Sequence, residues 1–229
     1  MKREDFMARV AQQLGRGRGA SDASVPRAWD PPVETAAIPC AELVARFSAE
    51  LAKIGGATQV CSSNADLEAK LIEFVRSSGA RRVVGFDRRT FAPFELERAW
   101  RELPLTTWES APGDAAEKFR ARVAAADIGL SIADLGVAAT GSLLFRADAQ
   151  RPRSVSLLPR SHIALLRERD LVPDLAQAFA WLALQGAPPS SALFVTGPSR
   201  TSDIENDLTL GVHGPAAVTV FLVDSSIGS

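Results

Sequence analysis

One loop in the sequence combines residue types that are suited to holding an anion. An apolar, strand-like run leads into Thr196–Thr201, which reads Thr-Gly-Pro-Ser-Arg-Thr. Gly197 lets backbone amides come close to a ligand, and Arg200 can bind a carboxylate or phosphate through two parallel hydrogen bonds. Ser202 and Glu205 have the spacing of a capping box, so we expect a helix to start there and to direct its amino terminus at the loop. The alternative is that Arg200 pairs with an acidic residue of this helix and has only a structural role.

Both histidines of the chain are candidates for acid–base chemistry. His213 is flanked by glycines in the segment Gly211–Pro215, so its imidazole has little cover from neighbouring side chains. His162 follows Arg160 in a segment whose turn is fixed by Pro159, so positive charge lies nearby. Histidine titrates near neutral pH and can donate or accept a proton, which makes these two residues the candidates for catalysis. For His213 the alternative is a loop histidine that only hydrogen-bonds a backbone carbonyl.

A fourth segment, Thr140-Gly141-Ser142, is a predicted turn of small residues. Its amides and hydroxyls can surround an oxyanion, although glycine turns between strands are often only turns. No metal site is expected, because Cys40 and Cys61 form no Cys-x-x-Cys pair and two histidines cannot build a site alone. The predicted ligands of a small carboxylate or phosphate are Thr140, Gly141, Ser142, Arg160, Gly197, Ser199, Arg200, Thr201 and Gly214.

These loops must be positioned by the elements around them, whose apolar periodicity alternates between strand and helix. Helical spacing predicts helices over residues 40–54, 64–77, 94–102 and 173–185, the second of them capped by Asn64. Strand patterns occur around Val60 and over residues 82–86, 105–108, 192–196 and 218–223. Short apolar runs with tight connections occupy residues 128–132, 143–145, 155–158 and 163–166. The alternation implies a largely parallel sheet, and the tightly connected runs imply a mixed or antiparallel insertion.

Length and composition are those of one α/β core with a short amino-terminal extension. Residues 1–35 are expected to form a short helix, with Phe6, Val10 and Leu14 on one side, and a Gly/Arg/Pro-rich linker; residues 36–229 form the α/β domain. The net charge of -1, from 26 basic and 27 acidic residues, argues against nucleic-acid binding. The chain lacks a long apolar run and a secretory signal, so we expect no membrane span and a cytoplasmic location.

Taken in order, the four segments resemble the LUD domain of the lactate utilization protein C family. The resemblance covers roughly residues 35–224 and is carried most specifically by Thr196–Glu205 and Gly211–Pro215. It implies a mainly parallel sheet with helices on both faces, similar to the sugar-isomerase and CoA-transferase-like group, with a small mixed or antiparallel β insertion. One departure is Ala139, at a position where relatives often carry an acidic residue, which weakens a catalytic carboxylate there.

The resemblance also implies a function. The chain would be an accessory subunit in the oxidation of L-lactate to pyruvate, binding a small anion and working with iron–sulfur partner proteins that carry the clusters. The presence of only two cysteines agrees with a chain that binds no cofactor of its own. The resemblance leaves open whether the subunit is catalytic or structural. The alternative is a free-standing enzyme or a sensor that binds a CoA ester, nucleotide, folate or organic acid.

Overall fold

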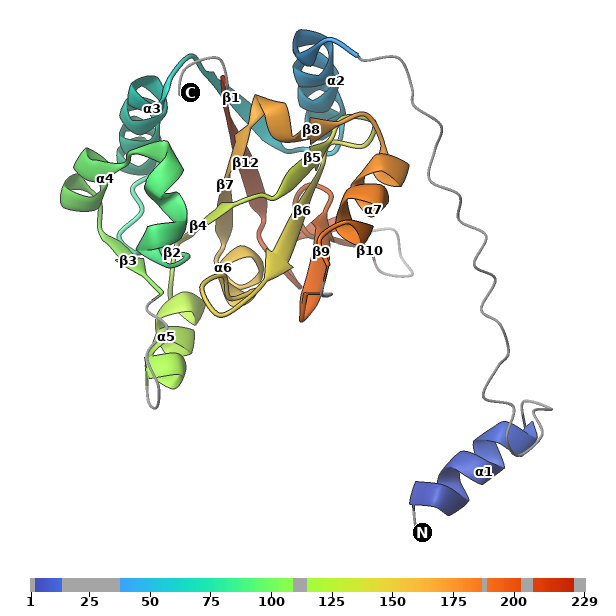
Figure 1. The fold of residues 1–229 in the computed structure, drawn as a ribbon. Helices are drawn as coiled ribbons and strands as arrows, with labels where there is room; N and C mark the ends of the chain where they lie inside the picture. The colour runs from blue at the N-terminus through green and yellow to red at the C-terminus, as the bar shows by residue number, and fades with distance from the viewer. Residues whose placement is uncertain (1–2, 14–37, 109–114, 187–188, 203–207, 225–229) are drawn as a thin grey trace. The chain divides into compact units, whose positions relative to one another are not determined.

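The computed structural model describes residues 3–13, 38–108, 115–186, 189–202 and 208–224. The chain divides into two compact units, Met1–Val33 and Glu34–Ser229. The first unit contains helix α1 (Arg3–Gln13), on which Phe6 and Val10 are exposed. Leu14 and the predicted Gly/Arg/Pro-rich linker lie outside the described residues. The second unit contains every other helix and strand of the described chain (Figure 1).

The second unit is built on a six-stranded sheet in which all neighbouring strands run parallel. Its strands, in spatial order, are β1 (Ala57–Cys61), β12 (Ala217–Val223), β7 (Ser161–Arg167), β4 (Ile128–Ile132), β2 (Val83–Gly85) and β3 (Leu105–Thr107). The central strands are apolar over nearly their whole length, as expected for strands that are covered on both faces. The predicted parallel α/β fold is therefore confirmed.

Helices cover one face of this sheet, and a helix together with a second sheet covers the other. The first face carries α3 (Asn64–Ser77), a 3₁₀ segment η1 (Arg88–Phe94), α4 (Glu97–Glu102), α5 (Ala115–Ala124) and α6 (Ser154–Leu157). The second face carries α2 (Cys40–Lys53). The predicted cap Asn64 is wrong, because Asn64 is the first residue of α3. The cap is Ser63, whose hydroxyl accepts a hydrogen bond from the Asp66 amide at 3.1 Å.

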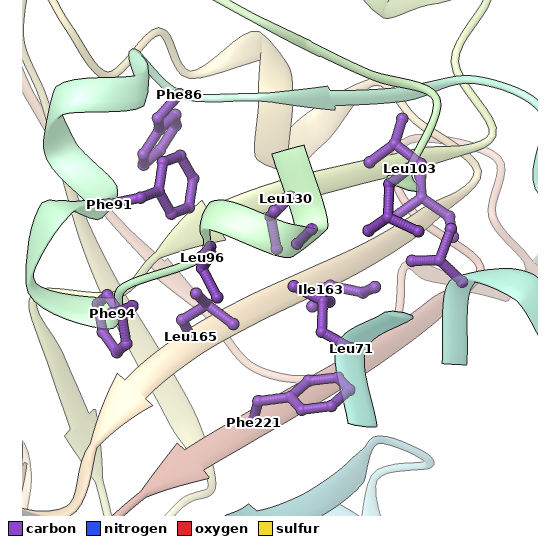
Figure 2. Close-up of a cluster of buried hydrophobic side chains, with 14 of the residues drawn as sticks. Leu71, Phe86, Phe91, Phe94, Leu96, Leu103, Leu130, Ile163, Leu165 and Phe221 are labelled. Atoms are coloured by element: carbon purple, nitrogen blue, oxygen red, sulfur yellow. The ribbon is translucent and has the colours of Figure 1, made fainter. Parts of the chain in front are cut away.

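Strand β7 lies between two hydrophobic cores, one on each face of the main sheet. Ile163 and Leu165 belong to a helix-side core, which contains the buried side chains of α3, η1, α4, α5 and α6 and is drawn in part in Figure 2. Ala164 and Leu166 belong to a sheet-side core, which contains the buried side chains of α2 and of the second sheet. This alternation fixes the direction of each β7 side chain, because successive residues of a strand point to opposite faces.

The second sheet has mixed pairing, which confirms the predicted β insertion. Its order is β8 (Leu171–Val172), β5 (Leu135–Val137), β6 (Ser142–Ala147) and β9 (Ser191–Val195), with α7 (Leu175–Ala183) packed on it. Strands β5 and β9 are antiparallel to β6, whereas β8 is parallel to β5. No helix in the described part of the chain is long and apolar enough to cross a membrane.

One predicted strand is wrong. The apolar run at residues 155–158 is the short helix α6 and not a strand; Val155 is buried against the main sheet while Leu158 is exposed. A run of four residues with three apolar side chains cannot distinguish a strand from one helical turn. The helix expected after Ser202 could not extend beyond residue 207, because β10 (Arg200–Ser202) pairs antiparallel with β11 (Leu208–Leu210). Residues 203–207, including Glu205 of the predicted capping box, lie outside the described residues.

Candidate functional site

The loops predicted to bind an anion meet at the amino ends of the main-sheet strands. Arg160 directly precedes β7, the segment Gly211–Pro215 leads into β12, and the end of α2 leads into β1. The amide of Ala216 donates to the carbonyl of Arg160 at 2.8 Å. The amide of Ser199 donates to the carbonyl of Pro215, also at 2.8 Å. Segments that are distant in the sequence are thus joined by backbone hydrogen bonds into one loop cluster.

The Thr140–Ser142 turn contributes a chain of hydroxyl groups to this cluster. The Thr140 and Ser142 Oγ atoms are 2.7 Å apart, and the Ser142 Oγ is 2.8 Å from the Thr196 Oγ1. Ser142 is buried, whereas Thr196 is exposed, so the chain runs from the interior to the surface. Gly141 has a φ of +61°, and an added Cβ would lie 2.4 Å from the Leu51 amide nitrogen. The turn therefore needs glycine, because it packs directly against the backbone of α2.

The Gly197–Arg200 part of the loop cluster holds the carboxyl end of α2. Gly197 has a φ of +74°, and an added Cβ would lie 3.1 Å from the carbonyl oxygen of Ile54. The Arg200 Nη2 donates to that same oxygen at 2.5 Å. A cation at the carboxyl end of a helix satisfies a free carbonyl and complements the helix dipole. Arg200 is nevertheless exposed, and a guanidinium has further N–H groups that can bind an anion.

Ser199 joins the Gly211–Pro215 segment at several points. The Gly211 amide donates to the Ser199 carbonyl at 2.9 Å, and the His213 amide lies 3.4 Å from the Ser199 Oγ. An added Cβ on Gly214 would lie 3.3 Å from the Ser199 Cβ, so this glycine allows a close approach of the two segments. The His213 side chain is exposed. Thr201 pairs with Thr209 in the β10–β11 ribbon.

His162 is not part of the loop cluster, because its side chain is buried in the sheet-side core. It is 1 % exposed, its Nε2 is 2.7 Å from the Ser131 Oγ, and its ring lies 5.4 Å from that of Phe145. Its Nδ1 has no hydrogen-bond partner in the described structure. Burial lowers the pKa of His162 to about 4, so the imidazole is neutral at pH 7. The predicted neighbour Arg160 points elsewhere, since its side chain is exposed.

Ser202, expected to cap a helix, is the last residue of β10, and the residues that would form the first turn of that helix lie outside the described residues. The remaining basis for anion binding is the chemistry of the loop cluster itself: an exposed arginine, several hydroxyls and closely packed glycines. The structure brings these candidates together: Thr140, Gly141, Ser142, Gly197, Ser199, Arg200, Thr201, His213 and Gly214, with Arg160 joined through its carbonyl.

A second group of charged residues, which sequence reasoning missed, lies at the opposite ends of the strands. The chain runs from β2 to β3 at one edge of the sheet, and from β4 through β7 to β12 toward the other edge, so the topological switch point lies between β2 and β4. Asp87 follows β2 and Asp134 follows β4. A carboxylate directly after an apolar, strand-like run is a pattern in the sequence that could have predicted this group.

Arginines neutralise both of these carboxylates. The Nε and Nη2 atoms of Arg89 donate to Asp87 at 2.9 and 2.6 Å, which holds the pKa of Asp87 below its usual value. Asp134 accepts from Arg146 Nη2 at 2.9 Å and from Arg151 Nη1 at 2.8 Å. The switch point is therefore occupied by internal ion pairs, and the loop cluster is the better candidate for a ligand.

Fold and loops together define a two-sheet α/β protein with a loop cluster at the amino ends of its parallel strands. The profile of the LUD domain family matches residues 44–223. The chain belongs to the lactate utilization protein C family, whose members carry this domain. The resemblance seen in the sequence is therefore confirmed.

Several relatives align over almost their full length. "Lactate utilization protein C" of Halalkalibacterium halodurans is 31% identical over 97% of this chain and 98% of its own. The protein of the same name from Bacillus subtilis is 29% identical over 96% of this chain and 95% of its own. Among solved structures, a DUF162 family protein from Deinococcus radiodurans superposes with a TM-score of 0.60 at 21% identity. The superposition covers 82% of this chain and 99% of that protein, and this likeness supports the fold.

Proposed function

We propose that this protein takes part in lactate utilization as an accessory subunit in the oxidation of L-lactate to pyruvate. The observation that carries the proposal is the alignment with relatives named lactate utilization protein C, which spans 97% of this chain and 98% of one such relative. An alignment over both whole chains supports a shared role better than a shared domain alone would.

We assign the electron transfer to partner proteins that carry iron–sulfur clusters. Oxidation of L-lactate to pyruvate removes two electrons and two protons, so it requires a redox group. Cys40 is exposed and Cys61 is buried in the helix-side core, and neither lies in a group of metal-ligating side chains within the described residues. The chain would then contribute binding and organisation to the complex and hold no cluster of its own.

The loop cluster would bind a small carboxylate or phosphate through Arg200. Its guanidinium is exposed, already oriented by Ile54, and close in the chain to the Ser199 and Thr201 hydroxyls. A pre-oriented arginine loses less side-chain entropy when it binds an anion. His213 lies on the same cluster and can supply a further hydrogen bond or a proton.

The subunit role is tested by leaving the chain out of the reaction. The iron–sulfur partners are mixed with L-lactate and an electron-accepting dye, with and without this protein. The proposal expects dye reduction to require the protein. Equal reduction without it would remove the obligate-subunit role and favour the free-standing enzyme or sensor.

The anion site is tested separately with Arg200→Lys, since lysine keeps one positive charge and one donor for the Ile54 carbonyl. Titration calorimetry with inorganic phosphate and with pyruvate should show binding weakened by about tenfold, because the two-pronged contact is lost. Arg101→Ala is the matched control, as it removes an exposed arginine on α4. Equal affinity of Arg200→Lys and the wild type would move the anion away from the loop cluster.

A further inference from the structure

We propose that a cavity on the helix side of the main sheet binds a small organic anion with an apolar body. The cavity, here called the amino-end cavity, has a volume of about 350 Å³ and lies between the end of α3 and the first residues of β4, β7 and β12. A neighbouring hollow of about 440 Å³ shares Gly79 and Asp127 with it. Of the residues singled out from the sequence, only Arg160 and His162 contribute to its wall.

The floor of the amino-end cavity is apolar with two hydroxyl groups. Ile163 and Ser161 are on the helix-facing side of β7, and Thr219 is paired with Ile163 on the adjacent strand. His162 contributes only backbone, since its side chain points to the opposite face, toward Phe145. Thr219 is 7 % exposed. In the described residues, neither the Thr219 nor the Ser161 hydroxyl has a hydrogen-bond partner.

The hydroxyls of Thr219 and Ser161 are free to bond to a ligand that enters the cavity. Phe74, at the wall, is held by an edge-to-face contact with Phe221 at 5.8 Å, so this side of the cavity is preformed. Preformed apolar walls with a few polar groups are typical of small-molecule sites, and this volume is at the small end of their range.

The rim of the cavity has an excess of positive charge. Arg160 lines the amino-end cavity, and Arg81 and Arg82 line the adjoining hollow. The ion pairs among the described residues do not include any of these three arginines. The acidic residue of the rim is Asp127, whose Oδ2 accepts the amides of Arg81 and Arg82, both at 2.9 Å.

Three arginines facing one carboxylate give the rim a net positive charge, and the apolar floor selects against small hydrated ions. A carboxylate or phosphate monoester attached to an aromatic or branched aliphatic group fits both features. Pyruvate and lactate are too small to fill this volume. The amino-end cavity is therefore a separate site from the loop cluster, and its ligand is a larger organic acid or phosphate ester.

The probe for the cavity is phenyl phosphate, with benzoate as the carboxylate counterpart and inorganic phosphate as the head group alone. Titration calorimetry should give saturable binding of phenyl phosphate or benzoate with a Kd of about 1 mM or tighter. Inorganic phosphate should bind at least about tenfold more weakly, because it has no apolar body to bury. In a proton–nitrogen NMR spectrum of the nitrogen-15-labelled protein, the amide resonances of Gly79 and Ser161 should shift when the probe is added.

Variants on the rim and in the floor assign the site. Arg81→Ala/Arg160→Ala removes two exposed cations and should weaken phenyl phosphate binding by about tenfold or more. Ser161→Leu fills the floor and should abolish binding, and Thr219→Val, which preserves shape, should weaken it. Arg101→Ala is the control and should bind as the wild type does, because this exposed arginine on α4 does not line the cavity.

Three results would overturn the proposal. They are an absence of saturable binding by both aromatic probes, an equal loss in Arg101→Ala and in the rim double variant, or wild-type affinity in that double variant. Because the rim arginines are exposed, the double variant is expected to fold, and a wild-type circular dichroism spectrum would establish that it has. A misfolded Ser161→Leu would therefore leave the rim variant as the deciding measurement.

Discussion

At the scale of single residues, the buried His162 gives the protein a pH-dependent stability. Its pKa of about 4 in the fold lies below the ordinary value of 6.5, so the unfolded chain takes up a proton that the folded chain refuses. Above pH 6.5 the imidazole is neutral in both the folded and the unfolded chain, so the free energy of unfolding does not depend on His162. As the pH falls from 6.5 toward 4, only the unfolded chain binds the proton, and the free energy of unfolding decreases. This interval corresponds to roughly 3 kcal/mol.

The measurement is the free energy of unfolding in urea between pH 4.5 and 7.5. The matched variant is His162→Leu/Ser131→Ala, which removes both polar partners and leaves no unpaired hydroxyl. Carboxylates contribute to the pH dependence of both proteins, so the difference between the two profiles reports His162. The variant should lose about 2 kcal/mol less than the wild type between pH 6.5 and 4.5. Parallel profiles would contradict the assignment.

Alanine substitutions at two glycines with left-handed backbone distinguish the cost of backbone strain from the cost of a steric clash. Gly141 (φ +61°) and Gly79 (φ +68°) have similar backbone geometry, but an added Cβ at Gly141 meets the Leu51 backbone at 2.4 Å, whereas one at Gly79 meets nothing within 4 Å. Gly79→Ala should cost about 1 kcal/mol from the positive φ alone. Gly141→Ala should cost about 3 kcal/mol, because α2 must also move. Chemical denaturation of the two variants decides the matter, and equal costs would be contrary to the close packing of this turn.

The residue chemistry of the loop cluster can be predicted from the sequence, but its arrangement cannot. Residue types and glycine spacing by themselves point to the Thr140 turn, Arg200 and His213. They do not place Arg200 against Ile54, which lies 146 positions away in the chain. Pro159 predicts a turn that brings Arg160 near His162, whereas the side chain of this histidine is buried within strand β7 and that of Arg160 is exposed.

At the scale of elements, Asp134 links the end of β4 to β6 and to the segment that follows it. Its side chain is 5% exposed and pairs with Arg146 on β6 and with Arg151. Asp134→Asn keeps the shape but removes the charge, leaving two arginines without their counter-ion. The expected loss is about 3 kcal/mol, as for other broken buried ion pairs.

The control is Asp148→Asn, because Asp148 pairs with the same Arg151 but its side chain is 43% exposed. Surface pairs contribute little, so this variant should lose less than about 1 kcal/mol. Thermal and urea unfolding of both variants give the comparison. Similar losses would mean that burial of the Asp134 pair does not determine its contribution.

Periodicity predicts the long elements well and the short ones poorly. The helical spacing over residues 64–77 and the apolar run at residues 218–223 match α3 and β12 almost residue for residue. The strand predicted at α6 is wrong because one helical turn and a short strand share the same apolar pattern. Helix α5 escapes prediction because its buried face consists of little more than Phe119 and Val123 among charged residues.

At the scale of the whole molecule, the two ends of the main sheet have different electrostatic character. At the carboxyl ends, Asp134 is neutralised by Arg146 and Arg151, whereas burial and the nearby Asp224 raise the pKa of Glu168, which follows β7. At the amino ends, arginines such as Arg160 remain without an ion pair in the described chain. Open α/β sheets usually bind ligands at the carboxyl ends, and here the charge distribution favours the opposite end.

The division of the chain into two units makes a prediction about stability. The described hydrophobic clusters draw all of their members from residues 34–229, and none from α1. A helix of eleven residues is marginal by itself in water, so the first unit adds little free energy of its own. A chain lacking residues 1–33 should therefore unfold cooperatively in urea with the midpoint and slope of the full chain, since the slope follows the surface exposed on unfolding. A midpoint lowered by more than the error of the measurement would show that the first unit stabilises the second. The same shortened chain in the dye-reduction assay then separates a need for residues 1–33 from a need for the α/β unit.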